Sequence, residues 1–168
     1  GNTTATDLPT QVLGGAYDQA ANGGVFDSYV LKCNSLGVRQ WATYYGGNGS
    51  DQASGLTTDA SGKVYVCGIT SSTNLPLVDP GGGAYFQSTP DTLIDAFILR
   101  FSSLGALQWA TYFGGMGGND EAYGITTSIS GLYVTGLTQS SSFPTMNPGG
   151  GAYFDGTLNG IQDAFIAK

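Results

Sequence analysis

The stretch WATYYGG at residues 41–47 decides the fold, because it returns as WATYFGG at residues 109–115, 68 positions later. The same interval separates the segment GGGAYF at Gly81 from its second copy at Gly149, and a shortened GGAY stands at Gly14. Self-similarity at a fixed period of this length is the signature of a repeat architecture, in which each copy folds into one similar unit.

A third repeated element shows where each copy of the repeat begins. The segments DSYVLK, DAFILR and DAFIAK begin at Asp27, Asp95 and Asp163, so they repeat the 68-residue interval twice. The corresponding division of the chain is a connection from a preceding repeat at 1–26, blade repeats at 27–94 and 95–162, and the first strand of a following repeat at 163–168.

The composition favours strands over helices throughout. The 168 residues include 28 Gly, 10 Tyr and 8 Phe but only one Glu, Glu121, and three Lys. Residues that favour exposed helix positions are therefore scarce, while strand formers and turn formers abound. No window of the sequence carries a sustained helical period. The chain is long enough for one ordinary domain, and we predict that it is all-β.

Within one period the hydrophobic pattern predicts four short strands separated by turn residues. In the second copy these strands cover residues 96–101, 107–113, 122–127 and 132–138. Tight turns join them, which predicts a four-stranded antiparallel meander. A longer connection at 139–162 follows, and its Pro and Gly content excludes a regular strand ladder through most of it.

The predicted strands are apolar on both faces. In AFILRF, the side chains of Phe97, Leu99 and Phe101 lie on one face, and those of Ala96 and Ile98 lie on the other. A strand of this kind has to be covered on both sides. Repeated four-stranded meanders with two apolar faces are what a β-propeller stacks around its axis, so we predict β-propeller-type blades.

The charges exclude several classes of function. The formal net charge is −7, and Lys and Arg are too few to form the basic clusters that bind phosphates, which argues against nucleic acid as a partner. No apolar run has transmembrane length, so we expect no membrane insertion. The sequence has no His, which removes Ser-His and Cys-His nucleophiles and His-ligated zinc. We expect no enzyme activity and no cofactor.

The repeats resemble a known family. WATYYGG followed by DASGKVYVCGITSSTNLP at 59–76, and WATYFGG followed by SISGLYVTGLTQSSSFP at 128–144, look like the SBBP repeat, a β-propeller repeat named for seven-bladed propellers. The resemblance covers nearly the whole chain, since GNTTATDLP at 1–9 mirrors GITSSTNLP. It implies blades of an extracellular or cell-surface protein of bacteria. The second copy departs from the first by losing Asp59 and one residue of the turn.

Two repeats cannot close a ring of blades. We therefore expect either that the chain is part of a longer array, or that several chains complete one propeller or stack into a fibre. An exposed apolar blade face favours such association. The expected partners are adjacent blades of the same chain or of neighbouring chains.

The segment GGNGSDQA at residues 46–53 matches the pattern of calcium-binding β-roll repeats. Its counterpart GGMGGNDEA at 114–122 is one residue longer and is not in immediate tandem, so a β-roll is excluded. We predict a Gly-rich turn in which the Asp accepts hydrogen bonds from turn amides. A calcium site that uses Asp51, or Asp120 with Glu121, together with backbone carbonyls, is the alternative.

Five further residues are candidates for binding a ligand. Asp27, Asp95 and Asp163 open the three copies of the first strand. We predict that each of them ties the long connection to its strand, and the alternative is that they line a central channel. Tyr85 and Tyr153 lie in the Gly-rich connections and are the candidates for contact with glycans.

The tryptophans and cysteines have plainer predicted roles. Trp41 and Trp109 lie inside strands, so we predict that they pack between blades rather than stack on sugars. Cys33 and Cys67 lie on different strands, and their counterparts in the next copy are not cysteines. We predict that both fill strand positions and form no disulfide.

The sequence supports two functions of different classes. The first is a non-catalytic structural or interaction module of an extracellular bacterial protein, which acts as a scaffold, an adhesive surface or a filament subunit. Low charge, many Tyr, Thr and Ser, and long Gly-Pro connections suit this function. The second is a carbohydrate-binding propeller with one pocket of aromatic residues and Asp per blade. A glycoside hydrolase needs only two carboxylates, but no pair is marked for that role.

Overall fold

The computed structural model describes residues 1–11, 13–90 and 94–168. In these ranges the chain forms strands and no helix, which confirms the predicted all-β fold. The strands are β1 (Asn2–Thr3), β2 (Asp27–Cys33), β3 (Arg39–Tyr45), β4 (Asp51–Thr58), β5 (Val64–Thr70), β6 (Asp95–Phe101), β7 (Leu107–Phe113), β8 (Asp120–Ser128), β9 (Gly131–Thr138) and β10 (Asp163–Ala167).

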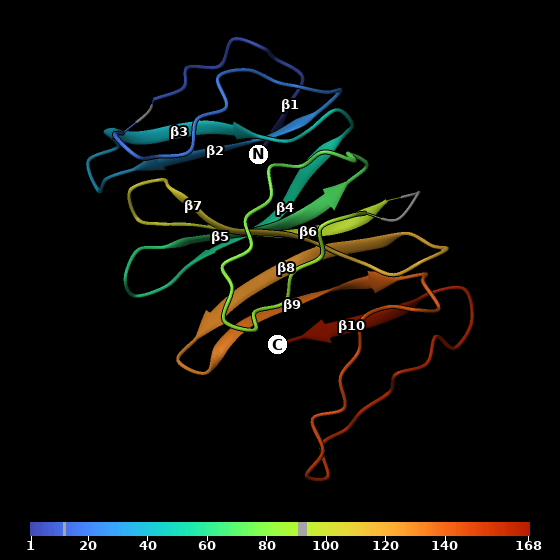
Figure 1. Cartoon of the computed structure of the whole chain (residues 1–168). Coiled ribbons are helices and arrows are strands. Elements are labelled where there is room, and N and C mark those ends of the chain that lie inside the picture. Colours follow the sequence, from blue (N-terminus) through green and yellow to red (C-terminus); the bar gives the residue numbers. More distant parts are fainter. Residues whose placement is uncertain (12, 91–93) are drawn as a thin grey trace.

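The strands form three antiparallel sheets that lie one on another, with the N-terminus in the first sheet and the C-terminus in the third (Figure 1). The first sheet has the order β1-β2-β3, the middle sheet β4-β5-β6-β7, and the third sheet β10-β9-β8. The middle sheet is thus one four-stranded blade, and the described residues of the other two sheets supply three strands each.

The four strands predicted between residues 96 and 138 are all present, but the prediction that they form one meander is wrong. β6 and β7 belong to the middle sheet, whereas β8 and β9 belong to the third sheet. β5 pairs with β6 along its whole length, from Val64 opposite Phe101 to Thr70 opposite Asp95. The long connection after β5 therefore joins two neighbouring strands of one sheet. The short Gly-rich turn after β7 carries the chain to the next sheet.

Equivalent strands of the three sheets pair in the same register. Thr70 lies opposite Asp95 in the middle sheet, and the equivalent residues of the other two sheets pair in the same way. The register also shifts at the same point of β4 and β8, between Ala53 and Gly55 and between Ala122 and Gly124. Each 68-residue period therefore folds in the same way, which brings the repeated aspartates to equivalent places.

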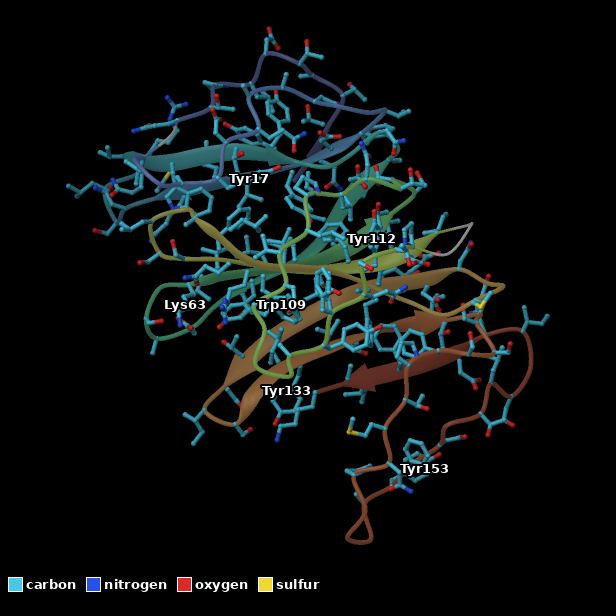
Figure 2. All side chains as sticks on the ribbon, in the orientation of Figure 1. Tyr17, Lys63, Trp109, Tyr112, Tyr133 and Tyr153 are labelled. Carbon is cyan, nitrogen blue, oxygen red and sulfur yellow. The ribbon has the colours of Figure 1, made fainter. Side chains whose placement is uncertain are left out.

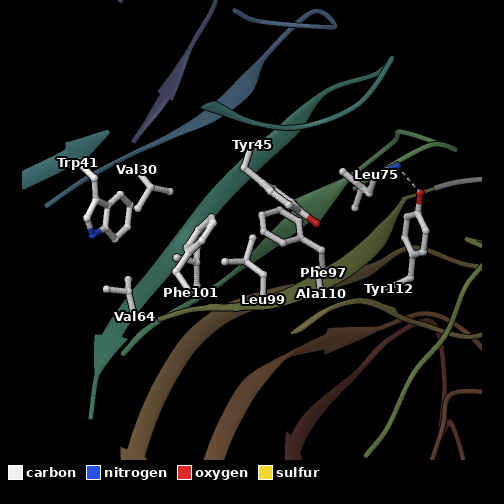
Figure 3. Packing of buried hydrophobic residues seen from close by; sticks show 11 residues of the cluster. Val30, Trp41, Tyr45, Val64, Leu75, Phe97, Leu99, Phe101, Ala110 and Tyr112 are labelled. Atoms are coloured by element: carbon white, nitrogen blue, oxygen red, sulfur yellow. Dashed lines mark hydrogen bonds between the residues drawn. The ribbon is translucent and has the colours of Figure 1, made fainter. Parts of the chain in front are cut away.

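Two apolar cores join the sheets. In the first core, Trp41 and Tyr45 of the first sheet pack on Phe97, Leu99 and Phe101 of the middle sheet, and all five side chains are buried (Figure 3). The second core lies on the other face of the middle sheet and contains Cys67, Ala96, Ile98, Phe113, Ala122, Val134 and Phe165. The prediction that these strands are covered on both faces is confirmed.

Two of the long connections lie along the edge strand that ends their sheet, β3 or β7. Val78 of the second connection exchanges two backbone hydrogen bonds with Ala110 of β7, and Gln11 of the first connection does the same with Ala42 of β3. This pairing covers an exposed strand edge. In the described part of the chain no strand pairs with the third connection, which extends away from the sheets (Figure 1).

Candidate functional site

The structure brings together two sets of candidate residues that the sequence analysis treated separately. Asp27 begins β2 of the first sheet, and Asp51 begins β4 of the middle sheet. Both residues are fully buried, at 0% exposure. A Cβ placed on Gly46 would lie 2.5 Å from Asp27 Oδ1 and 2.8 Å from Asp51 Oδ2. The two carboxylates therefore meet beside Gly46, and only a glycine leaves room for them.

Hydrogen bonds from neutral donors fix the Asp51 carboxylate. Thr70 Oγ1 donates to Oδ1 at 2.5 Å, while Ser72 Oγ and the Gly47 amide donate to Oδ2 at 2.6 and 2.7 Å. The predicted role of this Asp as an acceptor for turn amides is thus confirmed at Gly47. The two hydroxyl donors come from the end of β5 and the start of the connection that follows it.

The Asp27 carboxylate is only half satisfied. Its Oδ2 accepts hydrogen bonds from Gln19 Nε2 at 2.5 Å and from the Gly23 amide at 3.0 Å. These bonds agree with the predicted tie between the long connection and the strand. Its Oδ1 is buried and has no hydrogen-bond partner. Burial raises the pKa of this carboxyl, and the neighbouring Asp51 raises it further, against the lowering effect of the Gly23 amide.

The same arrangement recurs between the middle and third sheets. Asp95 of β6 and Asp120 of β8 are buried, and a Cβ on Gly114 would lie 2.8 Å from an oxygen of each. Asp120 Oδ2 accepts hydrogen bonds from the Gly115 amide and from Ser140 Oγ, both at 2.7 Å. Asp120 Oδ1 is buried without a partner. A carboxylate pair therefore bridges the sheets at both junctions.

A polar pocket of about 340 Å³ adjoins the first pair. Gly46 and Gly47 line this pocket and also contact the Asp27 and Asp51 carboxylates. Asp18, Asn48 and Asn74 also line the pocket and supply an exposed carboxylate and two side-chain amides. The pocket therefore places further oxygen atoms near the first pair.

Two glutamines that the sequence analysis missed hold the connections in place. The backbone N–H of Gln19 donates to Thr43 Oγ1 at 3.0 Å, and the side-chain oxygen of Gln19 accepts from the backbone N–H of Gly46 at 3.0 Å. Gln87 makes the equivalent bonds to Thr111 and Gly114, at 2.8 and 3.1 Å. The signal was the segment AYDQ, which returns as AYFQ one period later.

Two of the predicted carboxylates lie outside these pairs. Asp163 is half-buried at the start of β10, where its Oδ2 accepts a hydrogen bond from the Asn159 amide at 2.8 Å. The carboxylate of Glu121 accepts from Tyr123 Oη at 2.5 Å. The predicted combination of Asp120 with Glu121 is not what the geometry favours, because Asp120 meets Asp95 instead.

The two candidate glycan-binding tyrosines occupy different environments. The ring of Tyr85 packs edge-on against Phe113 at a centroid distance of 5.3 Å, and its hydroxyl donates to Gln87. Burial raises the pKa of Tyr85 to about 12. Tyr153 is 91% exposed on the extended third connection (Figure 2). Tyr85 is therefore engaged in packing, and a contact of either residue with glycans stays a prediction.

Trp41 and the cysteines lie as predicted. Trp41 is buried between the first and middle sheets, and its Nε1 donates to the Ser103 carbonyl at 3.3 Å. Trp109 is half-buried against the second core. Cys33 and Cys67 are free thiols. Cys67 fills the second core, where burial raises its pKa to about 11, while Cys33 is exposed on the outer face of the first sheet.

Comparisons with known proteins agree with this architecture. Residues 40–76 and 108–144 match the family described as Beta-propeller repeat, known as SBBP. An uncharacterized WD repeat-containing protein of Acanthamoeba polyphaga mimivirus is 21% identical over 109 residues, which is 65% of this chain and 8% of that protein. The sheets and these matches define an all-β protein of β-propeller-like repeat blades.

Two kinds of feature are absent from the described residues. No helix there is long and apolar enough to cross a membrane. No group of three or more Asp, Glu, Cys or His residues in the described ranges is placed to hold a metal ion.

Proposed function

We propose that this chain is a non-catalytic interaction module whose blades pack on further blades, of the same chain or of neighbouring chains, in a scaffold, adhesive surface or filament at the bacterial cell surface. The observation that carries the proposal is that the first sheet has an uncovered outer face, whereas the equivalent face of the middle sheet is buried under the sheet that precedes it. The repeat family and the distant WD-repeat relative support the coarser assignment to a repeat interaction module.

The outer face of the first sheet matches a buried face of the middle sheet. Phe97, Leu99 and Phe101 of the middle sheet are fully buried under the first sheet. The equivalent residues of the first sheet are Tyr29, Leu31 and Cys33. An open groove of about 710 Å³ runs over these three residues, and Leu31 is 49% exposed. The fold thus presents a surface of the kind that another blade covers.

The outer face of the third sheet has the complementary character. Ile98 is 5% exposed where it lies in the second core, whereas its equivalent in β10, Ile166, is 83% exposed. Within the chain, the face that carries Phe97 receives the preceding sheet, and the face that carries Ile98 receives the following sheet. The two outer faces would therefore fit each other head to tail, as the internal faces do.

The experiment is to measure the mass of the 168-residue chain in solution over a range of concentrations. The proposal predicts concentration-dependent association that Leu31→Lys weakens. Leu36→Lys is the matched control, because Leu36 and its equivalent Leu104 are 85% and 64% exposed in the turns of both copies. A chain that stays monomeric at every concentration, or one whose association is equally weakened by both variants, would contradict the proposal.

Two features support a role without catalysis. The chain has no His for acid-base or nucleophilic chemistry. The Asp27–Asp51 pair combines two carboxylates and one raised pKa, as a glycosidase pair does, but both residues are fully buried. A glycosidic bond cannot reach them in this arrangement. The absence of turnover on a panel of glycans is the expected result.

A further inference from the structure

Two carboxylates meet at the first junction, and none of the groups that donate hydrogen bonds to them carries a positive charge. The groups that donate to Asp27 and Asp51 are amides and hydroxyls of Gln19, Gly23, Gly24, Gly47, Thr70 and Ser72. All of these donors are neutral. Two ionised carboxylates that are side by side and removed from water repel each other, and each has lost its hydration. A bound positive charge would relieve both effects.

The junctions also contain buried acceptor atoms that nothing satisfies. Asp27 Oδ1 has no hydrogen-bond partner, although its residue is fully buried and the atom lies beside the Asp51 carboxylate at Gly46. Asp120 Oδ1 is in the same state at the second junction. Buried polar atoms in folded proteins are nearly always paired, so the recurrence at both junctions points to a bound water or a bound cation.

We propose that the Asp27–Asp51 pair binds a calcium ion that bridges the first and middle sheets, and that Asp95 and Asp120 form a second site of the same kind. Carboxylate oxygens are preferred ligands of hard cations, and two carboxylates match a double positive charge. Calcium accepts six to eight oxygen ligands in flexible geometry, including water and backbone carbonyls. Because no third carboxylate of the described residues closes on either pair, water and backbone oxygens complete the sites.

The surroundings predict that the first site is the stronger one. Asn48 and Met116 occupy equivalent positions, since the Asn48 amide donates to Asn74 Oδ1 and the Met116 amide donates to Ser142 Oγ. At the second junction, the positions equivalent to three oxygen-bearing residues of the polar pocket beside the first pair carry side chains that have no oxygen or are shorter. The replacements there are Asp18 by Phe86, Asn48 by Met116, and Asn74 by Ser142.

The test has two parts. Calorimetry measures the heat of calcium binding to the whole chain, and thermal unfolding measures the Tm in calcium, in magnesium and in EGTA. Calcium is expected to bind saturably and to raise the Tm, and magnesium to do so more weakly. Asp27→Asn should weaken the stronger site by about tenfold or more, and Asp95→Asn should affect only the weaker one. Asp7→Asn removes the same charge from an exposed position and should change neither.

The outcomes separate the proposal from its competitors. A wild-type chain with no calcium-dependent heat and no calcium-dependent Tm overturns it, and so does unchanged affinity in folded Asp27→Asn. If Asp27 and Asp51 share a proton instead of binding a cation, neither the heat nor the Tm will depend on calcium. If circular dichroism shows that Asp27→Asn does not fold, terbium bound to the wild type provides the readout. Its luminescence should be sensitised by Tyr17, whose hydroxyl donates to Gln19, the residue that in turn donates to Asp27. Calcium should displace the terbium.

Discussion

Trp41 of the first sheet packs against Phe101 of the middle sheet, with ring centroids 5.4 Å apart and ring planes inclined at 52°. This contact belongs to the first core, and Trp41 is 1% exposed. It shows that the repeated tryptophan joins one sheet to the next. Its equivalent, Trp109, is only half-buried, so the two tryptophans form a matched pair for measuring the strength of the junction.

We therefore expect Trp41→Ala to lower the free energy of unfolding by about 3–5 kcal/mol, because it leaves a large cavity between two sheets. Trp109→Ala should cost clearly less, since its side chain is already half in water. Urea unfolding followed by circular dichroism measures both changes without relying on tryptophan fluorescence. Equal losses in the two variants would show that the first junction does not depend on this packing.

Gly46→Ala tests the space in which the Asp27 and Asp51 carboxylates meet. The new methyl group would lie 2.5 Å from Asp27 Cγ, so both carboxylates would have to move. We expect a loss of about 1–3 kcal/mol in the free energy of unfolding. Gly14→Ala is the control, because a Cβ at Gly14 would have no neighbour within 4 Å. Thermal unfolding that shows the same Tm for both variants would contradict the account of the junction.

The turn between β4 and β5 depends on Asp59. Its Oδ1 accepts from the Ser61 amide and hydroxyl at 2.9 and 2.7 Å and from the Lys63 amide at 3.0 Å, while Tyr65 Oη donates to Oδ2 at 3.1 Å. The Ser61 hydroxyl, with the other donors, holds the pKa of Asp59 below its usual value. Such a group stabilises the fold above the ordinary Asp pKa, and the stabilisation is lost as the pH falls through the lowered pKa.

Asp59→Ala should accordingly lower the Tm at neutral pH, and the difference from the wild type should shrink as the solution is made strongly acidic. Tm values measured along a pH series give both results. Asp7→Ala removes an exposed carboxylate and serves as the control. A Tm difference that stays constant at every pH would mean that the ionised carboxylate is not what stabilises the turn.

The contribution of Asp27 to stability should depend on pH in the opposite direction to that of Asp59. Burial raises its pKa above the value of 3.8 that it has in the unfolded chain. Between these two pKa values the folded chain keeps a proton that the unfolded chain has lost. The stability that depends on this proton is therefore complete below the unfolded pKa and is lost as the pH rises through the folded pKa.

In EGTA, Asp27→Asn should therefore flatten the fall of Tm that accompanies a rise from about pH 4 to pH 7. Asp7→Asn should leave the slope as it is in the wild type. Differential scanning calorimetry in a series of buffers measures the slopes. An unchanged slope in Asp27→Asn would assign the pH dependence to other groups.

The sequence was sufficient to predict the strands and their two apolar faces. The alternation of Phe97, Ile98 and Leu99 identifies the faces, because side chains along a strand point to opposite sides in turn. The pairing of β5 with β6 was not predictable in this way. It joins strands that are separated by a long connection, and the pattern within each strand is the same whichever neighbour it has.

The carboxylate pairs show a similar limit. Asp27 was a candidate because an Asp opens each copy of the first strand, and Asp51 because it lies near the end of the Gly-rich turn. Their meeting depends on how one sheet lies on the next, which no local pattern encodes. One signal was present in the sequence: Gly46 follows WATYY and Gly114 follows WATYF, in a place where any side chain would separate the two acids.

Each 68-residue period contributes its strands to two sheets, because the long connection lies inside a sheet and the Gly-rich turn lies between sheets. Removing or copying any stretch of one period's length would join equivalent points of the fold. The number of blades in a gene of this kind can therefore grow or shrink by recombination without the need to evolve a new contact surface.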